Sequence, residues 1–205
     1  REIREKVRLS AFFAAKFNLE NLECAHELIS CLGVSDEKIR WDELKSPPGR
    51  FYIQEFDGRM VVVDFAHTPD AVENICRSIR ESFPGKTLVV LFGCGGDRDR
   101  TKRPLMGQAA ARYADRIILT SDNPRSEKPE QIIQDIAAGI PNFQQLTLET
   151  DRPKAVQDAL KALQQGEILL MAGKGHEDYI LIGQKKIPYS DVKEIEKFLR
   201  KNHHD

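Results

Sequence analysis

Short hydrophobic runs alternate with amphipathic stretches along most of this 205-residue chain. The runs Thr87–Phe92 and Glu167–Ala172 have the length and composition of buried strands. Between such runs, hydrophobic residues recur three and four positions apart, which is the spacing of one helical face. This pattern predicts strands at about residues 51–56, 60–64, 87–92, 116–120, 145–149 and 167–172, and helices at about 17–32, 69–79, 104–113, 132–137, 153–163 and 191–201.

The turns between these elements indicate the fold class. Asp57-Gly58 separates the first two strands, and a D-G pair between two such runs predicts a hairpin. A second hairpin is expected near residues 180–187. After the first hairpin, strands alternate with helices, which is typical of a parallel sheet. We therefore expect an α/β fold whose sheet is mainly parallel, with one antiparallel strand from the hairpin and helices on both faces.

A change of composition near residue 45 predicts two parts. Residues 34–49 are polar and end in Ser46-Pro47-Pro48-Gly49, which is typical of a linker. We expect residues 1–44 to be a helical remnant of one domain and residues 45–205 to be a second, α/β domain. The chain begins at Arg1 without a methionine and in a helical pattern, so we expect a fragment or a processed product.

Composition excludes several classes of protein. With 40% hydrophobic residues the chain is not typical of a disordered protein, and its net charge of −1 gives no overall basic field for nucleic acid or an anionic membrane. The apolar runs are shorter than a membrane span, and no leader peptide is evident. The four cysteines form no C-x-x-C pair, so we expect reduced, mostly buried thiols. These features predict a soluble, cytoplasmic protein, which we expect to be monomeric.

Polar residues cluster directly after four of the expected strands. In open α/β sheets, ligands bind at the carboxyl ends of the strands, so a shared pocket is the simplest explanation for these clusters. They are Asp64 with His67, GCGGDRD at 93–99, SDNPR at 121–125, and AGKGHE at 172–177.

The charges in these clusters suit a ligand that carries both signs. Arg125 lies between Pro124 and Pro129, which stiffen its loop and begin the next helix. A guanidinium at Arg98 or Arg125 can hold a carboxylate with two hydrogen bonds, and Glu177 can accept an ammonium. An amino acid fits this set better than a nucleotide alone. Taken singly, Arg125 would more often be a solvated loop charge, and it is the similar polar clusters after three other strands that favour a ligand site.

Two known phosphate-binding patterns are absent from the sequence. Gly93, Gly95 and Gly96 do not match G-x-G-x-x-G, because Arg98 stands where the third glycine would be, and they could simply permit a tight turn. Lys174 lies between two glycines, but G-x-x-x-x-G-K-[ST] occurs nowhere in the chain. We therefore expect no autonomous NTPase site.

Other polar residues have competing explanations. His67 and His176 could transfer protons or form loop hydrogen bonds, and the structural role is favoured for each. Asn18 and Asn21 could face a ligand or cap the helix at 17–32, and capping is favoured for either one alone. No carboxylates have convincing metal-ligand spacing.

Taken together, the motifs resemble those of the Mur ligases. The chain carries FNLEN, GR at 49–50, DFAHTPDA, GCGGDRD-x-x-KRPLM, DNPR and AGKGHEDY in that order, over residues 17–191. The resemblance implies that residues 1–44 end a central ATP-binding domain and that a Rossmann-like carboxyl-terminal domain follows, which receives the incoming amino acid. Phe65, where tyrosine is usual, and Phe51-Tyr52 after the Gly-Arg pair are small departures.

In this family the D-N-P-R loop marks enzymes that take meso-diaminopimelate in place of L-lysine. By resemblance, the meso-diaminopimelate site would consist of Arg98, Asp122, Asn123, Pro124, Arg125, Gly173 and Glu177. The nucleotide contacts of this half would be Asn18, Asn21, Arg50, Asp64 and His67.

The resemblance also implies a reaction. The complete enzyme would use ATP and Mg²⁺ to add meso-diaminopimelate to UDP-MurNAc-L-Ala-D-Glu, a peptidoglycan precursor. The residues that form the acyl phosphate would lie outside this chain, which alone would be inactive and bind no cofactor tightly. The alternative is a stand-alone amino-acid-binding or regulatory module. A nicotinamide-dependent oxidoreductase is disfavoured by the glycine spacing.

Overall fold

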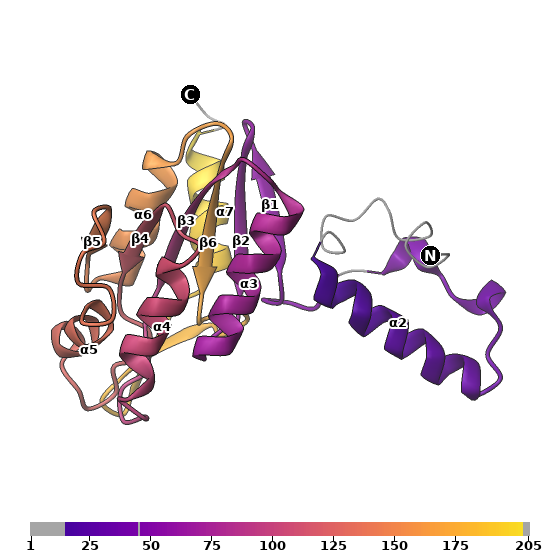
Figure 1. Ribbon diagram of the computed structural model, residues 1–205, viewed down its shortest axis with the longest axis horizontal. Coiled ribbons are helices and arrows are strands. Elements are labelled where there is room, and N and C mark those ends of the chain that lie inside the picture. The colour runs from indigo at the N-terminus through magenta and orange to yellow at the C-terminus, as the bar shows by residue number, and fades with distance from the viewer. Residues whose placement is uncertain (1–14, 45, 203–205) are drawn as a thin grey trace.

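The computed structural model describes residues 15–44 and 46–202. It contains six α-helices and eight strands within these ranges, arranged as shown in Figure 1. The helices are α2 (Lys16–Cys31), α3 (Pro69–Ser82), α4 (Lys102–Ala111), α5 (Pro129–Ala137), α6 (Arg152–Ala162) and α7 (Asp191–Asn202). The strands are β1 (Tyr52–Phe56), β2 (Arg59–Asp64), β3 (Thr87–Phe92), β4 (Arg116–Leu119), β5 (Leu146–Leu148), β6 (Glu167–Ala172), β7 (Tyr179–Ile182) and β8 (Lys185–Pro188).

Six of the strands form one sheet in the order β1-β2-β6-β3-β4-β5. β1 runs antiparallel to β2, and every other pair in the sheet is parallel. β6 pairs on one side with β2, with Val62 opposite Leu170, and on the other side with β3. β7 and β8 form a separate antiparallel pair. The prediction of a mainly parallel sheet with an antiparallel hairpin strand is confirmed.

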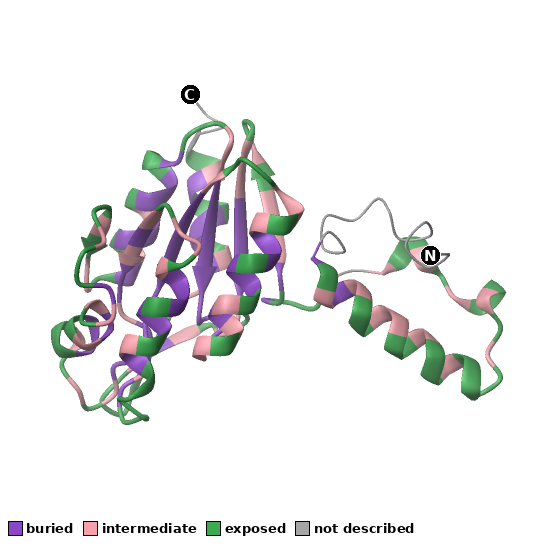
Figure 2. Cartoon of the chain, viewed as in Figure 1, coloured by how far each residue is buried: buried purple, intermediate pink, exposed green. Residues whose placement is uncertain are grey.

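Helices cover both faces of the sheet, as expected from the alternation of elements. Because successive strand residues point to opposite faces, Val62 and Val90 join the core under α3, α4 and α5. Val61 and Val89 join the core under α6 and α7. The central strands β2, β3 and β6 therefore appear in Figure 2 as a mostly buried layer between two layers of helices, whereas the edge strands β1 and β5 are only partly buried. No helix within residues 15–44 and 46–202 has both the length and the apolarity that a membrane crossing requires.

Local sequence signals account for several turns and helix ends. Asp57 and Gly58 both have positive φ angles, 47° and 71°, as a two-residue type I′ hairpin turn requires. The Thr68 hydroxyl caps α3 by accepting a hydrogen bond from the Ala71 N–H. Pro69 and Pro129 lie in the first turns of α3 and α5, where a missing N–H leaves no helical bond unmade.

The amino-terminal helix α2 lies beside the sheet domain (Figure 1). Near its start, the Phe17 ring packs edge-on against Phe51, with 5.7 Å between centroids. Farther along, its apolar side is open to solvent, with Leu28 69% and Leu32 82% exposed. The helix predicted at 17–32 is confirmed, but the described residues do not cover its apolar face. The expectation that the chain begins in mid-helix at Arg1 lies outside the described residues.

Two expectations about this helix are wrong. Cys24 and Cys31 are exposed, unlike the buried Cys76 and Cys94, because α2 makes few contacts with the sheet domain. Neither asparagine caps the helix, because the N-cap is Ala15 and no side chain bonds there. Asn18 lies inside the first turn and is buried.

Candidate functional site

Four loops meet at the carboxyl ends of β2, β6, β3 and β4, which are neighbours in the sheet. Between them lies a cavity of about 370 Å³. Six of the seven residues assigned to the amino-acid site by resemblance line it: Arg98, Asp122, Asn123, Arg125, Gly173 and Glu177. The seventh, Pro124, is buried in the same loop. His67, which resemblance assigns to the nucleotide, lines this cavity too.

Glycines allow the loops after β3 and β4 to pack backbone against backbone. A Cβ atom on Gly93 would lie 2.1 Å from the Thr120 carbonyl oxygen, and one on Gly96 would lie 1.9 Å from that of Pro124. The Gly96 N–H donates to the Asn123 carbonyl at 2.9 Å. Neither glycine has a positive φ. These glycines are therefore required by close approach and not by a tight turn.

Lys174 joins three polar partners beneath the cavity. Its side chain is fully buried, and its Nζ donates to Asn123 Oδ1 at 2.8 Å, to the Tyr179 carbonyl at 2.8 Å and to Glu177 Oε2 at 3.1 Å. Asp122 Oδ1 lies 3.0 Å from the same nitrogen as an ion pair without hydrogen-bond geometry. All three ammonium protons are thus used inside the protein. Lys174 has a structural role and is not free to bind a phosphate.

Asn123 and Lys174 together orient Glu177. The Asn123 side-chain amide donates to Glu177 Oε2 at 2.9 Å, and its own oxygen accepts from Lys174 and from the Leu181 N–H. Both bonds to Glu177 fall on Oε2. Within the described ranges Oε1 accepts no hydrogen bond, so one carboxylate oxygen remains for a donor in the cavity.

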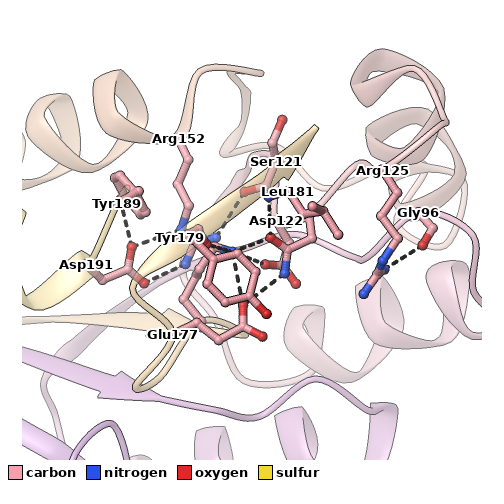
Figure 3. Close-up of polar contacts among 12 residues, drawn as sticks. Gly96, Ser121, Asp122, Arg125, Arg152, Glu177, Tyr179, Leu181, Tyr189 and Asp191 are labelled. Atoms are coloured by element: carbon pink, nitrogen blue, oxygen red, sulfur yellow. Dashed lines mark hydrogen bonds and ion pairs between the residues drawn. The ribbon is translucent and has the colours of Figure 1, made fainter. Parts of the chain in front are cut away.

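Two guanidiniums reach the cavity without a carboxylate partner among the described residues. Arg98 is exposed and makes no ion pair there. Arg125 is half-buried, and its Nη1 donates to the Gly96 carbonyl at 2.6 Å (Figure 3). The other N–H groups of the Arg125 guanidinium have no partner in the described part of the chain. The cavity thus combines two cations that can bind carboxylates with a carboxylate that can bind an ammonium.

Arg103 and Glu127 hold the loop after β3 against the start of α5. The Arg103 side chain is only 1% exposed, and it donates to both oxygens of Glu127, at 2.8 and 3.0 Å, and to Asp135 at 2.8 Å. The Asp97 N–H also donates to Glu127, at 2.6 Å. The Arg103 hydrogen bonds and the Asp97 N–H lower the pKa of Glu127 to about 2.

A second buried ion pair supports the site from the opposite face of the sheet. Arg152 binds both oxygens of Asp191, at 2.7 and 2.9 Å, and both side chains are 0% exposed (Figure 3). Arg152 also donates to the carbonyls of Ser121 and Ala172, at 3.2 Å each. Burial alone would lower the pKa of Arg152, but the Asp191 carboxylate raises it above its usual value. The pair links α6 and α7 to two of the loops around the cavity.

A larger cleft, of about 960 Å³, lies between α2 and α3. Four of the five residues assigned to the nucleotide by resemblance line it: Asn18, Asn21, Arg50 and Asp64. Arg50 is exposed, and its guanidinium lies 4.8 Å above the Phe65 ring. His67 thus lines a different cavity from the other four residues that resemblance assigns to the nucleotide.

Asp64 connects two loop segments. Its oxygens accept from the Phe51 N–H and the Ala66 N–H, each at 2.8 Å. Burial raises the pKa of Asp64, although these N–H groups and Arg50 act in the opposite direction. Asp64 therefore has a structural role in addition to lining the cleft.

The histidines near the cavity differ in their contacts. His67 Nδ1 lies 2.7 Å from the Phe65 carbonyl, which can only accept, so this nitrogen carries a proton and Nε2 can accept when the ring is neutral. The Phe65 ring lies between the rings of His67 and His176, with centroids 4.6 and 5.1 Å away. Cys94 also lines the cavity, but burial raises the pKa of its thiol to about 12, so it is no thiolate nucleophile at neutral pH.

Sequence reasoning missed the structural roles of three buried cations of the site, Arg103, Lys174 and Arg152. The first two stand inside the motifs KRPLM and AGKGHE, so their position within a motif was the available signal. Arg152 pairs with Asp191, 39 residues away, and no local pattern marks that pairing.

Residues 49–175 match the family model described as Mur ligase, glutamate ligase domain. The chain belongs to the Mur ligase family. This match covers the loops after β2, β3 and β4 and the first half of the loop after β6, so the family's domain includes most of the cavity.

Several Mur ligases of known sequence or structure are similar to the chain. It is 48% identical over 195 residues to the UDP-N-acetylmuramoyl-L-alanyl-D-glutamate--2,6-diaminopimelate ligase of Leptospira interrogans, covering 93% of this chain and 38% of the relative. It is 50% identical over 184 residues to the ligase of the same name from Aquifex aeolicus, covering 89% and 38%. A solved structure of a ligase with this name superposes with a TM-score of 0.74 at 41% identity, over 92% of this chain and 39% of that one. The chain thus spans about two fifths of the length of these relatives.

Proposed function

We propose that this chain is the carboxyl-terminal part of an ATP-dependent ligase that adds meso-diaminopimelate to UDP-N-acetylmuramoyl-L-alanyl-D-glutamate in the cytoplasm. The observation that carries the proposal is the charge arrangement of the 370 Å³ cavity. Arg98 and Arg125 have no carboxylate partner among the described residues, and Glu177 faces the same space. The names of the most similar ligases agree with this assignment.

The cavity's charges explain why meso-diaminopimelate would be preferred to L-lysine. Meso-diaminopimelate is lysine with a second carboxylate on its distal carbon, so it offers two carboxylates and two ammonium groups. In the proposal, Arg98 and Arg125 bind carboxylates and Glu177 Oε1 binds an ammonium. L-lysine would leave one guanidinium without a partner and facing an ammonium, and a site built for a polar group rejects ligands that lack it.

We assign the nucleotide to the larger cleft, with Arg50 toward the phosphates and Asn18, Asn21 and Asp64 around it. When bound, ATP supplies the phosphoryl group that activates the accepting carboxylate. The open cleft and the exposed Arg50 suit a nucleotide. No three His, Cys, Asp or Glu side chains within residues 15–44 and 46–202 group as metal ligands. We therefore place the Mg²⁺ ligands and the residues that form the acyl phosphate outside this part, and we expect the chain alone to be inactive.

Substrate preference and an Arg125→Ala variant test the proposal in the full-length protein that carries this chain. We expect the protein to use meso-diaminopimelate in preference to L-lysine. A lost hydrogen bond to a charged group is worth about 1.5–3 kcal/mol, so Arg125→Ala should lower kcat/KM for meso-diaminopimelate roughly 10- to 100-fold and leave KM for ATP unchanged.

The control for this variant is Arg200→Ala, which removes an exposed arginine on α7. Arg200→Ala should change neither kcat/KM for meso-diaminopimelate nor KM for ATP. Preferential use of L-lysine by the parent protein would refute the proposed specificity.

A second candidate function is a stand-alone amino-acid-binding module. It is favoured by one observation, that Arg98, Arg125 and Glu177 line one cavity within residues 65–177 of this chain. Titration calorimetry of the 205-residue chain with meso-diaminopimelate separates the two. Binding by the chain alone would support the module, whereas a site that needs the rest of a ligase would give no heat of binding.

A further inference from the structure

Arg125 has a backbone conformation that needs support from its surroundings. Its φ angle is 52°, in the left-handed region that residues with a side chain seldom adopt. Such a conformation persists only where neighbouring structure holds it, and it is often found at binding sites. The side chain leaving this backbone passes 2.9 Å from the position of a Cβ on Gly95 and ends at the Gly96 carbonyl (Figure 3). The direction of the guanidinium thus depends on the unusual φ.

The support comes from the β7–β8 hairpin. The Arg125 N–H donates to the Leu181 carbonyl at 3.0 Å, and the Arg125 carbonyl accepts from the Gly183 N–H at 2.7 Å. These two bonds make an isolated parallel bridge between Arg125 and Ile182. Both backbone polar groups of Arg125 are therefore bound by a single strand end.

The hairpin is attached to the cavity loops and is not a member of the main sheet. The Leu181 N–H donates to Asn123 Oδ1 at 2.9 Å, and the Tyr179 carbonyl accepts from Lys174 at 2.8 Å. Its outer strand β8 is exposed at every residue. The main connections of this small hairpin to the molecule are thus the residues that build the cavity.

We infer that the β7–β8 hairpin sets the preference for an amino acid with a distal carboxylate by holding Arg125 in its left-handed conformation. The inference rests on the proposed function and deepens it. Leu181 and Gly183 are positioning residues, because they do not line the cavity and act through Arg125. If Arg125 relaxed to a negative φ, its Cα–Cβ bond would point elsewhere and the guanidinium would leave the position in which it meets a carboxylate. A displacement of about 1 Å at a positioning group can reduce the rate by roughly 10²-fold.

The chain offers a matched pair of glycines for a test. Gly183 has a φ of 57°, and no atom lies within 4 Å of an added Cβ. Gly166 has a φ of 82°, and its N–H donates to the Gly58 carbonyl at 2.8 Å, at the opposite end of the sheet. Proline at either position removes one backbone hydrogen bond and forbids the positive φ. Only Gly183 is bonded to Arg125.

The experiment measures KM for meso-diaminopimelate, KM for ATP and selectivity over L-lysine in the full-length protein. We expect Gly183→Pro to raise KM for meso-diaminopimelate at least about 10-fold and to reduce selectivity, with KM for ATP unchanged, whereas Gly166→Pro changes neither. Gly183→Ala keeps the N–H and strains only φ, so it should give a smaller shift in the same direction. If the Gly183→Pro protein does not fold, the result for Gly183→Ala tests the inference.

A double variant shows whether Gly183 acts through Arg125. Once Arg125→Ala has removed the guanidinium, adding Gly183→Pro should have no further effect on selectivity. Additive effects, or equal behaviour of the Gly183 and Gly166 variants, would overturn the inference. If Arg125→Ala reduces selectivity and neither Gly183 variant does, the inference fails while the proposed function stands. If Arg125→Ala itself changes nothing, both fail.

Discussion

At the scale of single residues, one buried ammonium connects the loops that form the cavity. Lys174 bonds to a side chain from the loop after β4, to Glu177 in its own loop, and to the backbone of β7 at Tyr179. A fully buried lysine is rare unless it is paired, because removing an ammonium from water is costly. Its partners compensate that cost only while all of them stay in place. Lys174 therefore couples the geometry of the site to the stability of the fold.

Replacing Lys174 with methionine should be strongly destabilising, although the two side chains have similar length. The change would leave the Tyr179 carbonyl without the Lys174 donor, Asn123 Oδ1 with the Leu181 N–H as its one donor among the described residues, and Asp122 and Glu177 without a cation. Because the two carboxylates are partly exposed, we expect the lower end of the cost of breaking a buried pair, about 3 kcal/mol in the free energy of unfolding, or roughly 6–12 °C in Tm. Thermal and denaturant unfolding of the chain would measure it.

Lys161 provides the control for that change. It is 67% exposed and lies 3.8 Å from Asp158 on the surface of α6. Lys161→Met should cost less than about 1 kcal/mol, since exposed pairs contribute little. Equal effects of the two substitutions would show that the bonds of Lys174 to Asn123, Glu177 and Tyr179 do not stabilise the fold.

At the scale of elements, Glu127 attaches the loop after β3 to the first residues of α5. It accepts hydrogen bonds from Arg103 and from the Asp97 N–H, and the Arg100 guanidinium lies 2.9 Å away as an ion pair. Asp97 in turn accepts from the Ser126 hydroxyl at 2.5 Å. Arg98 follows Asp97 directly, so the attachment holds the loop that carries one of the two guanidiniums.

The low pKa of Glu127 predicts how acid weakens this attachment. Its ordinary pKa is 4.5, and mainly the Arg103 hydrogen bond lowers it to about 2 in the folded protein. A lowered folded-state pKa gives stability that is fully present above about pH 4.5 and is lost as the pH falls toward 2. Unfolding free energies of the parent and of Glu127→Gln, measured across this range, should therefore converge at the acid end.

The matched control is Glu130→Gln, which removes an exposed carboxylate from the first turn of α5, three residues after Glu127. The Glu130→Gln protein should lose as much unfolding free energy between pH 4.5 and pH 2 as the parent does. A Glu127→Gln protein that loses as much stability as the parent over this range would contradict the prediction.

At the scale of the whole molecule, a buried ion pair ties the outer helices to the ligand edge of the sheet. Arg152 begins α6 and Asp191 begins α7, and the Tyr189 hydroxyl donates to Asp191 at 2.7 Å. Since Arg152 also holds the carbonyls of Ser121 and Ala172, the pair connects one helical layer with two cavity loops. The Arg152–Asp191 pair is thus buried in the core and also holds two of the loops that form the cavity.

Removing one member of this pair should cost more than removing both. Arg152→Met would leave Asp191 as an unpaired buried charge, at a cost of about 3–5 kcal/mol in unfolding free energy. Combining it with Asp191→Leu should give a loss well below the sum of the two single losses, because the double variant contains no unpaired charge. Denaturant unfolding of the three variants measures the coupling.

The exposed pair of Arg200 and Glu196, 3.7 Å apart on α7, is the control. Its double-variant cycle should give a coupling below about 1 kcal/mol. Strict additivity for Arg152 and Asp191 would contradict the account of a coupled pair.

The sequence predicted the elements well because buried strands and amphipathic helices have distinct periodicities in this chain. The hairpin at Asp57-Gly58 and the helix starts at Pro69 and Pro129 have local causes, so local reasoning located them. The position of β6 between β2 and β3 was not predictable in this way. It depends on which hydrophobic strand best fills the centre of the sheet, which is a property of the whole chain.

The candidate site was predictable to the extent that it depends on the carboxyl ends of parallel strands. Arg98, Arg125 and Glu177 line one cavity because their strands are near neighbours, while their roles toward a ligand stay predictions. The separation of His67 from Asn18 and Arg50 was not foreseen, because it depends on how α2 lies against α3. The buried role of Lys174 was missed because lysine in a loop is normally solvated.

The central place of β6 has a consequence for synthesis of the protein on the ribosome. Residues 167–172, which form β6, are the last strand of the main sheet to be translated. Both β2 and β3 lack a neighbouring strand on one side until β6 pairs with them. Until β6 emerges, the earlier strands expose hydrophobic edges, a state prone to aggregation and a natural target for chaperones. The loop with Glu177 and the hairpin that supports Arg125 leave the ribosome directly afterwards. The nascent chain therefore completes its main sheet and its ligand cavity in close succession, before α7 covers one face of the sheet.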